Sequence, residues 1–257
     1  MAGVQNNAGG LLQNPKIVTA VFSSTEYAWI WLIARTYVGY AWLDAGWHKI
    51  TDDGWMVTGV ALKGFWQRAV TIPETGRPPI AFDWYRELLQ FLLSSGSHVW
   101  FAKLIAIGEF VVGLALLIGL FVGIAAFFGA FLNWNFMLAG SASTNPVLGL
   151  IGIGVMIAWK TSGWWGLDRF ILPYVGAPWQ RGKLFGGERL VVSGSGVESS
   201  RLAIEEWVRM LAGVGLGLYA LVSLSGAMQV AVLLVAGVIV GVTGLGLFPI
   251  LRSAPTK

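Results

Sequence analysis

The sequence contains no cysteine, which excludes disulfides, thiolate chemistry and cysteine-held iron–sulfur clusters within this chain. It also has few charged residues, 12% of the total, where a soluble domain has about 25%. Its net charge of +4 is modest and spread out, so it does not indicate a nucleic-acid partner. No phosphate-binding loop, HExxH motif or nucleophile elbow is present. We expect no metal or iron–sulfur cluster in this chain.

What remains is strongly apolar: 56% of the residues are hydrophobic and the mean hydropathy is +0.68. A spanning helix needs about 20 mostly apolar residues. Six such stretches are predicted, namely 27–50, two within 100–140 that turn near 119–123, 145–160, 208–224 and 228–251. The predicted fold is therefore an all-α polytopic membrane protein, a four-helix transmembrane bundle followed by a two-helix transmembrane hairpin.

These helices divide the chain into four parts. We expect a polar tail without a signal-peptide layout at 1–24, a four-helix membrane domain at 25–175, a Gly/Ser-rich cytoplasmic linker at 176–199, and the hairpin with its tail at 200–257. With six spans, the side that carries both termini has ten Lys and Arg residues and the other side has six. This bias predicts cytoplasmic termini and a multi-pass protein of the cell membrane.

Residues 51–99 are then a long extracytoplasmic loop. Its second half spaces Phe82, Trp84, Tyr85, Leu88 and Leu89 as a broad apolar stripe. We interpret this segment as an interfacial helix on the outer face, with Arg86 and Glu87 toward water.

Two charges interrupt the apolar runs, Arg35 in the first and Glu109 in the second. A charge in hydrocarbon costs several kcal/mol unless it is paired or faces a polar cavity. At a rise of ~1.5 Å per residue, the two lie roughly 5 Å apart in depth, which an Arg side chain can cover. The pair could be a structural staple or part of a polar pocket for a quinone head group or protons, or Arg35 could snorkel unpaired. Asn133 and Asn135 could complete such a pocket, and Trp134 could stack on an aromatic ligand.

Both histidines of the chain fall on the outer face. His48 ends the first span four residues after Asp44, and His98 precedes the second. Because His titrates near neutral pH, Asp44, His48 and His98 could form a proton-exchanging cluster. They could also be polar residues that anchor helix ends at the interface.

The last two predicted helices are rich in glycine. The spacings Gly213-x3-Gly217 and Gly237-x3-Gly241 match a small-residue packing motif. They indicate tight packing of the hairpin on itself, or an interface with a partner subunit or a second copy.

The order of several short motifs resembles the DoxX family of membrane proteins. These motifs are Arg35-x3-Gly39…Gly46-x2-Lys49, Glu109-x3-Gly113…Gly119-Leu120 and Gly166-Leu167-Asp168-Arg169. The long loop and Asn133-x-Asn135…Asn145-Pro146 are more similar to the branch known as DoxD-type thiosulfate:quinone oxidoreductase subunits. The final segment, Gly241-x2-Gly244…Phe248-Pro249, resembles a YgaP-like transmembrane hairpin, in which a Cys commonly stands before the Pro.

The resemblance implies a membrane subunit of a quinone-linked oxidoreductase that passes electrons from thiosulfate or another sulfur compound to quinone. Arg35, Glu109, Asn133, Asn135 and Trp134 would bind quinone, and Asp44, His48 and His98 would exchange protons. The alternatives are a non-catalytic scaffold or anchor of a larger redox or respiratory complex, and a small-solute or proton transporter.

Overall fold

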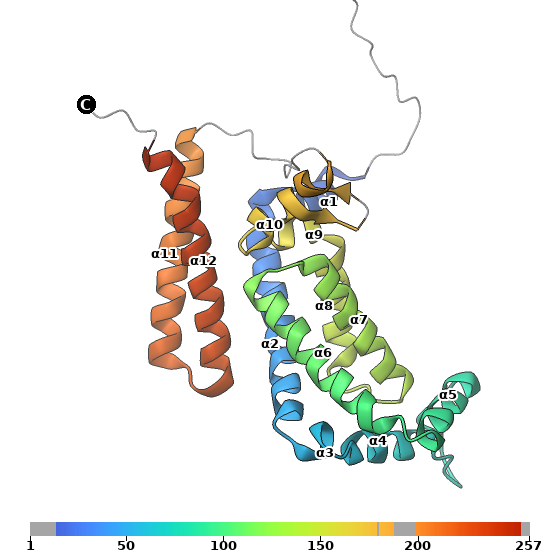
Figure 1. Ribbon diagram of the computed structural model, residues 1–257. Coiled ribbons are helices and arrows are strands. Elements are labelled where there is room, and N and C mark those ends of the chain that lie inside the picture. The colour runs from blue at the N-terminus through green and yellow to red at the C-terminus, as the bar shows by residue number, and fades with distance from the viewer. Residues whose placement is uncertain (1–13, 179, 188–198, 253–257) are drawn as a thin grey trace, which may run out of the picture.

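The computed structural model describes residues 14–178, 180–187 and 199–252. Within these ranges the protein is mostly helical, with one short β-hairpin, which confirms the all-α prediction (Figure 1). The elements in chain order are α1 (Lys16–Ser23), η1 (Thr25–Tyr27), α2 (Ala28–Ile50), α3 (Asp53–Met56), α4 (Val60–Val70), α5 (Asp83–Ser94), α6 (His98–Ile118), α7 (Val122–Leu138), α8 (Asn145–Ile157), α9 (Trp159–Ser162), α10 (Asp168–Val175), β1 (Gly176–Ala177), β2 (Gln180–Arg181), η2 (Lys183–Phe185), α11 (Ser199–Ser223) and α12 (Gly226–Arg252).

Helices α2, α6, α7 and α8 form a bundle in which α2 packs on α6, α6 on α7, α7 on α8, and α8 again on α2 (Figure 1). Aromatic and small side chains alternate in its core, with Trp31 and Trp42 on α2, Val112 on α6 and Ala126 on α7 all buried. The apolar runs of the sequence thus cover both the inside of the bundle and its outer surface, as expected of helices in lipid.

Glycines bring α2 and α6 close together. A Cβ on Gly113 would lie 2.2 Å from the Leu43 nitrogen, and one on Gly46 would lie 2.4 Å from the Phe110 nitrogen. Small residues were predicted to allow close helix contact in the hairpin, but the closest such contact lies inside the bundle, between α2 and α6. In the hairpin, a Cβ on Gly213 would meet Val240, whereas one on Gly237 or Gly241 would meet nothing within 4 Å.

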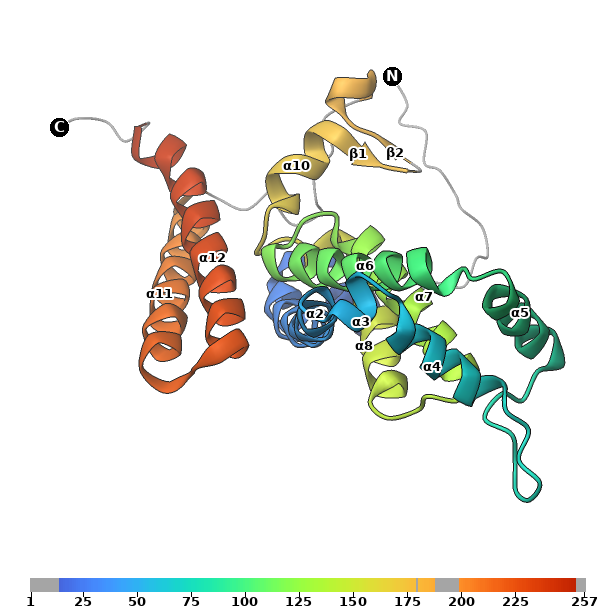
Figure 2. The same cartoon turned by 60° about the horizontal axis from the view of Figure 1, so that its bottom comes forward.

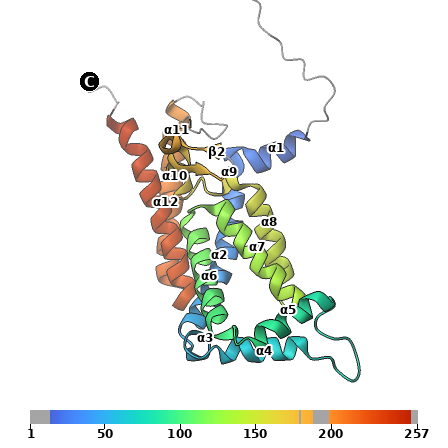
Figure 3. The ribbon, with the colours of Figure 1, turned by 45° about the vertical axis from the view of Figure 1, so that its right-hand side comes forward.

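The loop between α2 and α6 is folded. Helices α3, α4 and α5 lie across the end of the bundle at which α2 finishes (Figures 2 and 3). We call this the α4 end. Leu62 and Trp66 of α4 and Leu89 of α5 form a second core with the start of α6. Helix α5 matches the predicted short helix, but Arg86 is mostly buried, not turned to water, because it bonds Asp83 and the Ile80 carbonyl.

The opposite end carries α1, α9, α10 and the short hairpin of β1 and β2 (Figures 1 and 2). We call it the α10 end. Part of the predicted polar tail is helix α1, which is bent by 68° against the helical segment that follows; residues 1–13 lie outside the described part. The predicted linker includes β1, β2 and η2, while residues 188–198 are not described.

Helices α11 and α12 pack against each other, and α12 also contacts α2 and α6 (Figure 3). Val235 and Ile239 of α12 pack with Leu43 and Leu117 of the bundle. The link to α10 is ionic, because Glu206 of α11 pairs with Arg169 of α10; Glu206 also pairs with Arg209 of its own helix.

Of the helices described, α6 alone is long and apolar enough to cross a membrane, and a second candidate arises if α1 and the segment 25–50 count as one bent span. Helices α7 and α8 are apolar but have 17 and 13 residues, or about 26 and 20 Å at ~1.5 Å per residue. A bilayer core is about 30 Å thick. The six spans and their orientation therefore remain a prediction.

Candidate functional site

The Arg35 side chain is fully buried and binds backbone carbonyls. Its Nη1 donates to the Leu116 oxygen and, at 2.9 Å, to the Leu117 oxygen, while Nη2 donates to the Trp165 oxygen at 3.0 Å. The predicted ion pair between Arg35 and Glu109 is therefore wrong. Arg35 instead neutralises the carbonyls that α6 leaves unpaired where it ends.

Helix geometry explains why Arg35 does not pair with Glu109, as the sequence had suggested. The last four carbonyls of a helix have no partner within it and carry partial negative charge. Glu109 and Leu116 are seven residues apart, or about 10 Å along α6. Gly39 packs against Leu116 and Gly46 against Glu109, so Arg35, four residues before Gly39, is level with the end of α6 and Glu109 lies about 16 Å nearer the α4 end. The Arg35 Cζ lies against the end of α6, since a Cβ on Gly119 would be 3.1 Å from it.

Glu109 pairs with Lys49. Its Oε2 accepts from the Lys49 Nζ at 2.6 Å, and Lys49 also lies 3.4 Å from the Ala45 oxygen. The Glu109 side chain is almost fully buried, whereas that of Lys49 is 19% exposed. The sequence did contain a signal for this partner. Lys49 lies fourteen residues after Arg35, close to four helical turns, and so on nearly the same face of α2.

The structure joins only part of the predicted proton-exchanging cluster. His48 Nδ1 lies 2.8 Å from the backbone oxygen of Asp44 and 3.7 Å from the Asp44 carboxylate, and the His48 side chain is exposed. His98 belongs to the first turn of α6, and its buried Nδ1 has no partner. Among the described residues, no hydrogen bond or ion pair links His98 to Asp44 or His48.

The predicted aromatic and amide residues of α7 also separate. Trp134 is exposed on the outer surface, and Asn135 donates to the Phe131 oxygen at 2.8 Å. The Tyr85 hydroxyl of α5 donates to the Asn135 backbone oxygen at 3.0 Å, and burial raises the pKa of Tyr85 to about 12. Asn133 differs, since it is buried and neither its Oδ1 nor its Nδ2 has a partner.

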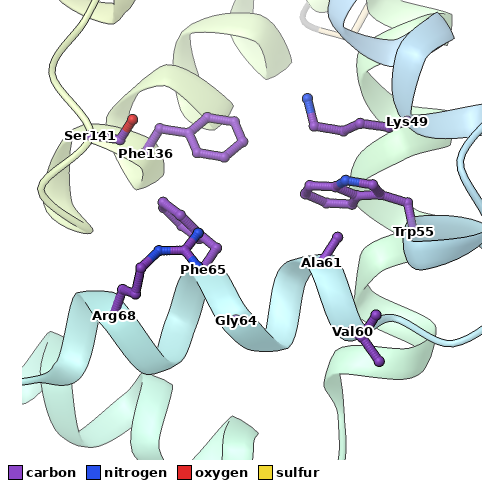
Figure 4. Close-up of a pocket in the computed structure, with 9 residues that line it drawn as sticks. All are labelled: Lys49, Trp55, Val60, Ala61, Gly64, Phe65, Arg68, Phe136 and Ser141. Atoms are coloured by element: carbon purple, nitrogen blue, oxygen red, sulfur yellow. The ribbon is translucent and has the colours of Figure 1, made fainter.

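A cavity of about 430 Å³ opens at the α4 end, between the end of α2, the loop helices and the end of α7 (Figure 4). Trp55, Phe65 and Phe136 line it with aromatic surface, and Ser141 and Lys49 contribute polar groups (Figure 4). Its complete lining is Lys49, Trp55, Val60, Ala61, Gly64, Phe65, Arg68, Phe136 and Ser141. The Lys49 ammonium lies 5.2 Å from the centre of the Trp55 ring.

Unpaired hydrogen-bonding groups also lie inside the bundle, further from the α4 end than the residues that line this cavity. Trp42 Nε1 and Glu109 Oε1 are buried without partners, as is the Asn133 amide. A Cβ on Gly129 would lie 2.9 Å from Trp42 Nε1 and 3.3 Å from Val112. Asn133 lies one helical turn after Gly129 on α7, and Glu109 lies one helical turn before Val112 on α6. Because the two helices are antiparallel, both steps lead toward the α4 end.

The aromatic cavity has the Lys49 cation in its wall, and the bundle interior behind Lys49 has a carboxylate oxygen, an indole N–H and an amide. Lys49 connects the two, because it lines the cavity and binds Glu109. A buried polar group without a partner costs about 1–3 kcal/mol, and four of them in one region point to a ligand that would satisfy them. The set suits a planar molecule with carbonyl or hydroxyl groups. Among the described residues, no group of three His, Cys, Asp or Glu could hold a metal ion.

Asp168 is a further functional candidate that the sequence marked only within a motif. Its carboxylate accepts from the Phe121 nitrogen at 2.6 Å and from the Val122 nitrogen at 2.8 Å, and thereby caps α7. Burial raises the pKa of Asp168 to about 6, although the two amide hydrogen bonds and Arg35 oppose the shift.

The fold and site define a helical bundle, apolar on its outer surface, with a largely aromatic cavity at one end that is large enough for a ligand. The DoxX family model matches residues 30–139, from α2 to the end of α7. DoxX is a membrane-associated family with redox-related members, so the match supports contact with a lipid bilayer and favours a redox-related role. Searches of curated proteins and of solved structures gave no match.

Proposed function

We propose that this protein is a membrane subunit of a quinone-linked oxidoreductase, and that the quinone head group binds in the cavity beside Lys49. The observation that carries the proposal is the conjunction of this cavity with the Lys49–Glu109 ion pair and the unpaired groups behind it. The site differs from the one expected from the sequence: Lys49 and Trp42 replace Arg35, Asn135 and Trp134, while Glu109 and Asn133 remain.

The residues present fit the chemistry of such a head group. The two carbonyl oxygens of a quinone need donors, which the Lys49 ammonium, the Trp42 indole and the Asn133 amide can provide. The hydroxyls of the reduced form need acceptors, for which Glu109 Oε1 and the Asn133 oxygen are available. Trp55, Phe65 and Phe136 offer rings on which the planar head could pack.

Bound quinone would supply the capacity to take up two electrons and two protons. The protein's own part is to hold the ring and to handle the protons. Glu109 can hold a proton at Oε1, and Lys49, which is bonded to Oε2 at 2.6 Å and partly exposed, connects that carboxylate to the α4 end. A sulfur compound such as thiosulfate, or a partner subunit, would deliver the electrons.

The test is binding of decylubiquinone to the purified full-length protein in detergent. Wild type should bind it with a Kd of about 1 μM, which corresponds to a binding free energy of about −8 kcal/mol. Lys49→Met and Trp42→Phe should each weaken binding about tenfold, as expected for the loss of one buried hydrogen bond. Lys63→Met, which removes an exposed cation of the neighbouring α4, is the matched control and should bind as wild type does.

Thiosulfate-dependent reduction of decylubiquinone would then establish the enzyme. No binding by wild type, or equal binding by all four proteins, would contradict the proposed site. Stoichiometric partner proteins that co-purify without quinone would support the alternative, a scaffold subunit. One observation favours that alternative: Gly237 and Gly241 of α12 face open space, where a helix of another chain could approach.

A further inference from the structure

A second hollow lies at the α10 end, at the opposite end of the bundle from the proposed quinone site. This groove has a volume of about 540 Å³ and runs between the start of α7 and the hairpin of β1 and β2. Phe121, Ile124, Val175, Pro178 and Phe185 make it apolar, and Arg181 is the one charged residue that lines it. A narrower recess of about 20 Å³ continues from it toward Trp159 and Leu172.

The groove is continuous with the apolar outer surface of α7. Ile124, Phe128 and Phe131 succeed one another on one face of this helix, and all three are exposed. In a membrane protein such a face contacts acyl chains. A chain that lies along these side chains would therefore lead directly into the groove beside Ile124.

The groove has positively charged side chains near its rim. Arg181 of β2 is exposed, and within the described part of the chain its side chain has no hydrogen bond or ion pair. Lys160 lies near the same recess, with its ammonium 5.9 Å from the centre of the Trp159 ring. Asp168, which also borders the recess, is already engaged by two backbone amides. The rim therefore offers unpaired positive charge.

The neighbouring η2 has the character of a membrane-interface segment. Leu184 and Phe185 are 70% and 62% exposed, beside the exposed Lys183. Exposed apolar side chains next to cations are typical of segments that lie at the boundary between head groups and acyl chains. The groove thus has its apolar part toward the α7 face and its cation where head groups would lie.

We propose that this groove binds an anionic phospholipid, with one acyl chain along Ile124, Phe128 and Phe131 and the head-group phosphate beside Arg181. The proposal does not depend on the quinone site, which lies at the other end of the bundle. A zwitterionic lipid has the same acyl chains and lacks the net charge, so the anionic lipid should be preferred.

The experiment uses the full-length protein, delipidated in a neutral maltoside detergent, and native mass spectrometry with added dioleoyl phosphatidylglycerol or dioleoyl phosphatidylcholine. Wild type should retain phosphatidylglycerol in preference to phosphatidylcholine. Arg181→Gln should reduce that preference about fivefold, the usual effect of one cation near an anionic head group. Arg77→Gln removes an exposed Arg of the loop before α5 and is the matched control.

A second variant tests the acyl path. Ile124→Trp should fill the groove and lower the retention of both lipids. If the larger side chain disturbs folding, Arg181→Gln still tests the proposal, because that substitution is at an exposed position. The proposal fails if wild type shows no preference for phosphatidylglycerol, or if Arg181→Gln matches wild type. It also fails if inorganic phosphate at equal concentration displaces the lipid, because the site would then bind a free anion.

Discussion

Arg35 and Asp168 hold the same turn from opposite sides. Arg35 donates to the Leu116 and Leu117 carbonyls at the end of α6, and Asp168 accepts from the Phe121 and Val122 amides at the start of α7. The cation thus meets the negative end of one helix and the carboxylate the positive end of the next. Two costly buried charges are in this way matched to unpaired backbone groups, and they fix the connection between two bundle helices.

Replacing Arg35 by Met should destabilise the protein by about 3 kcal/mol, because the buried carbonyls at the end of α6 lose their donor. Arg35→Lys should cost less, since it keeps the charge but cannot reach three carbonyls with a planar fork. Thermal unfolding in detergent measures both, with Arg77→Met as the exposed control. Equal midpoints for Arg35→Met and the control would contradict the capping role.

The contact of α2 with α6 should not tolerate a side chain at Gly113. Gly113→Ala would place a methyl 2.2 Å from the Leu43 nitrogen and 2.6 Å from the Leu43 Cα, so backbone must move. Such overpacking costs about 1–3 kcal/mol.

Gly108 lies on the same helix and a Cβ there would meet nothing within 4 Å, so it provides the matched control. Gly108→Ala should be neutral or stabilise by up to about 1 kcal/mol through helix propensity. A comparison of the two thermal midpoints decides the matter. The close approach of α2 and α6 would be refuted if both changes shifted stability alike.

The sequence predicted the helical elements of this fold well, because long apolar runs, Gly119 and Pro146 mark where helices run and where they begin or end. Gly119 has φ of +69°, and a Cβ there would be 2.7 Å from Gly166, so the turn requires a glycine. The short elements outside the long apolar runs were not predicted. Helix α1 has eight residues and each strand of the β-hairpin has two, so neither contains the long apolar run by which the sequence marks the bundle helices.

The candidate site was predicted less well, for a physical reason. Sequence reasoning paired the two buried charges with each other, since it counted side-chain partners only. The structure uses a backbone partner for Arg35 and a flexible one, Lys49, for Glu109. Trp134 turned outward because it follows Asn133 directly and so lies about 100° away on α7. Which polar atoms stay unpaired, such as Trp42 Nε1, depends on three-dimensional packing and leaves no mark in sequence.

The Lys49–Glu109 pair should behave as a coupled unit. Lys49→Met leaves a buried carboxylate unpaired, which costs about 3–5 kcal/mol when one partner of a buried pair is removed. The double change Lys49→Met with Glu109→Leu should restore stability to within about 1 kcal/mol of wild type, because apolar pairs often replace buried ion pairs at no cost. Quinone binding should stay weakened in the double variant. Additive losses of stability would show that the two residues do not act together.

Stability should depend on pH through Asp168. Its pKa is about 6 in the folded protein against an ordinary value of 3.8, so between these values the folded state binds more protons than the unfolded state. Stability must then fall as pH rises from about 4 to about 6, and the loss is complete above the folded pKa. Asp168→Asn cannot titrate and supplies the baseline for every other carboxylate. From about pH 4 to about pH 6, the thermal midpoint of wild type should therefore fall relative to that of the variant. From about pH 7 to about pH 8, the difference between the two midpoints should stay constant. A difference that is independent of pH would mean that Asp168 keeps an ordinary pKa in the folded protein.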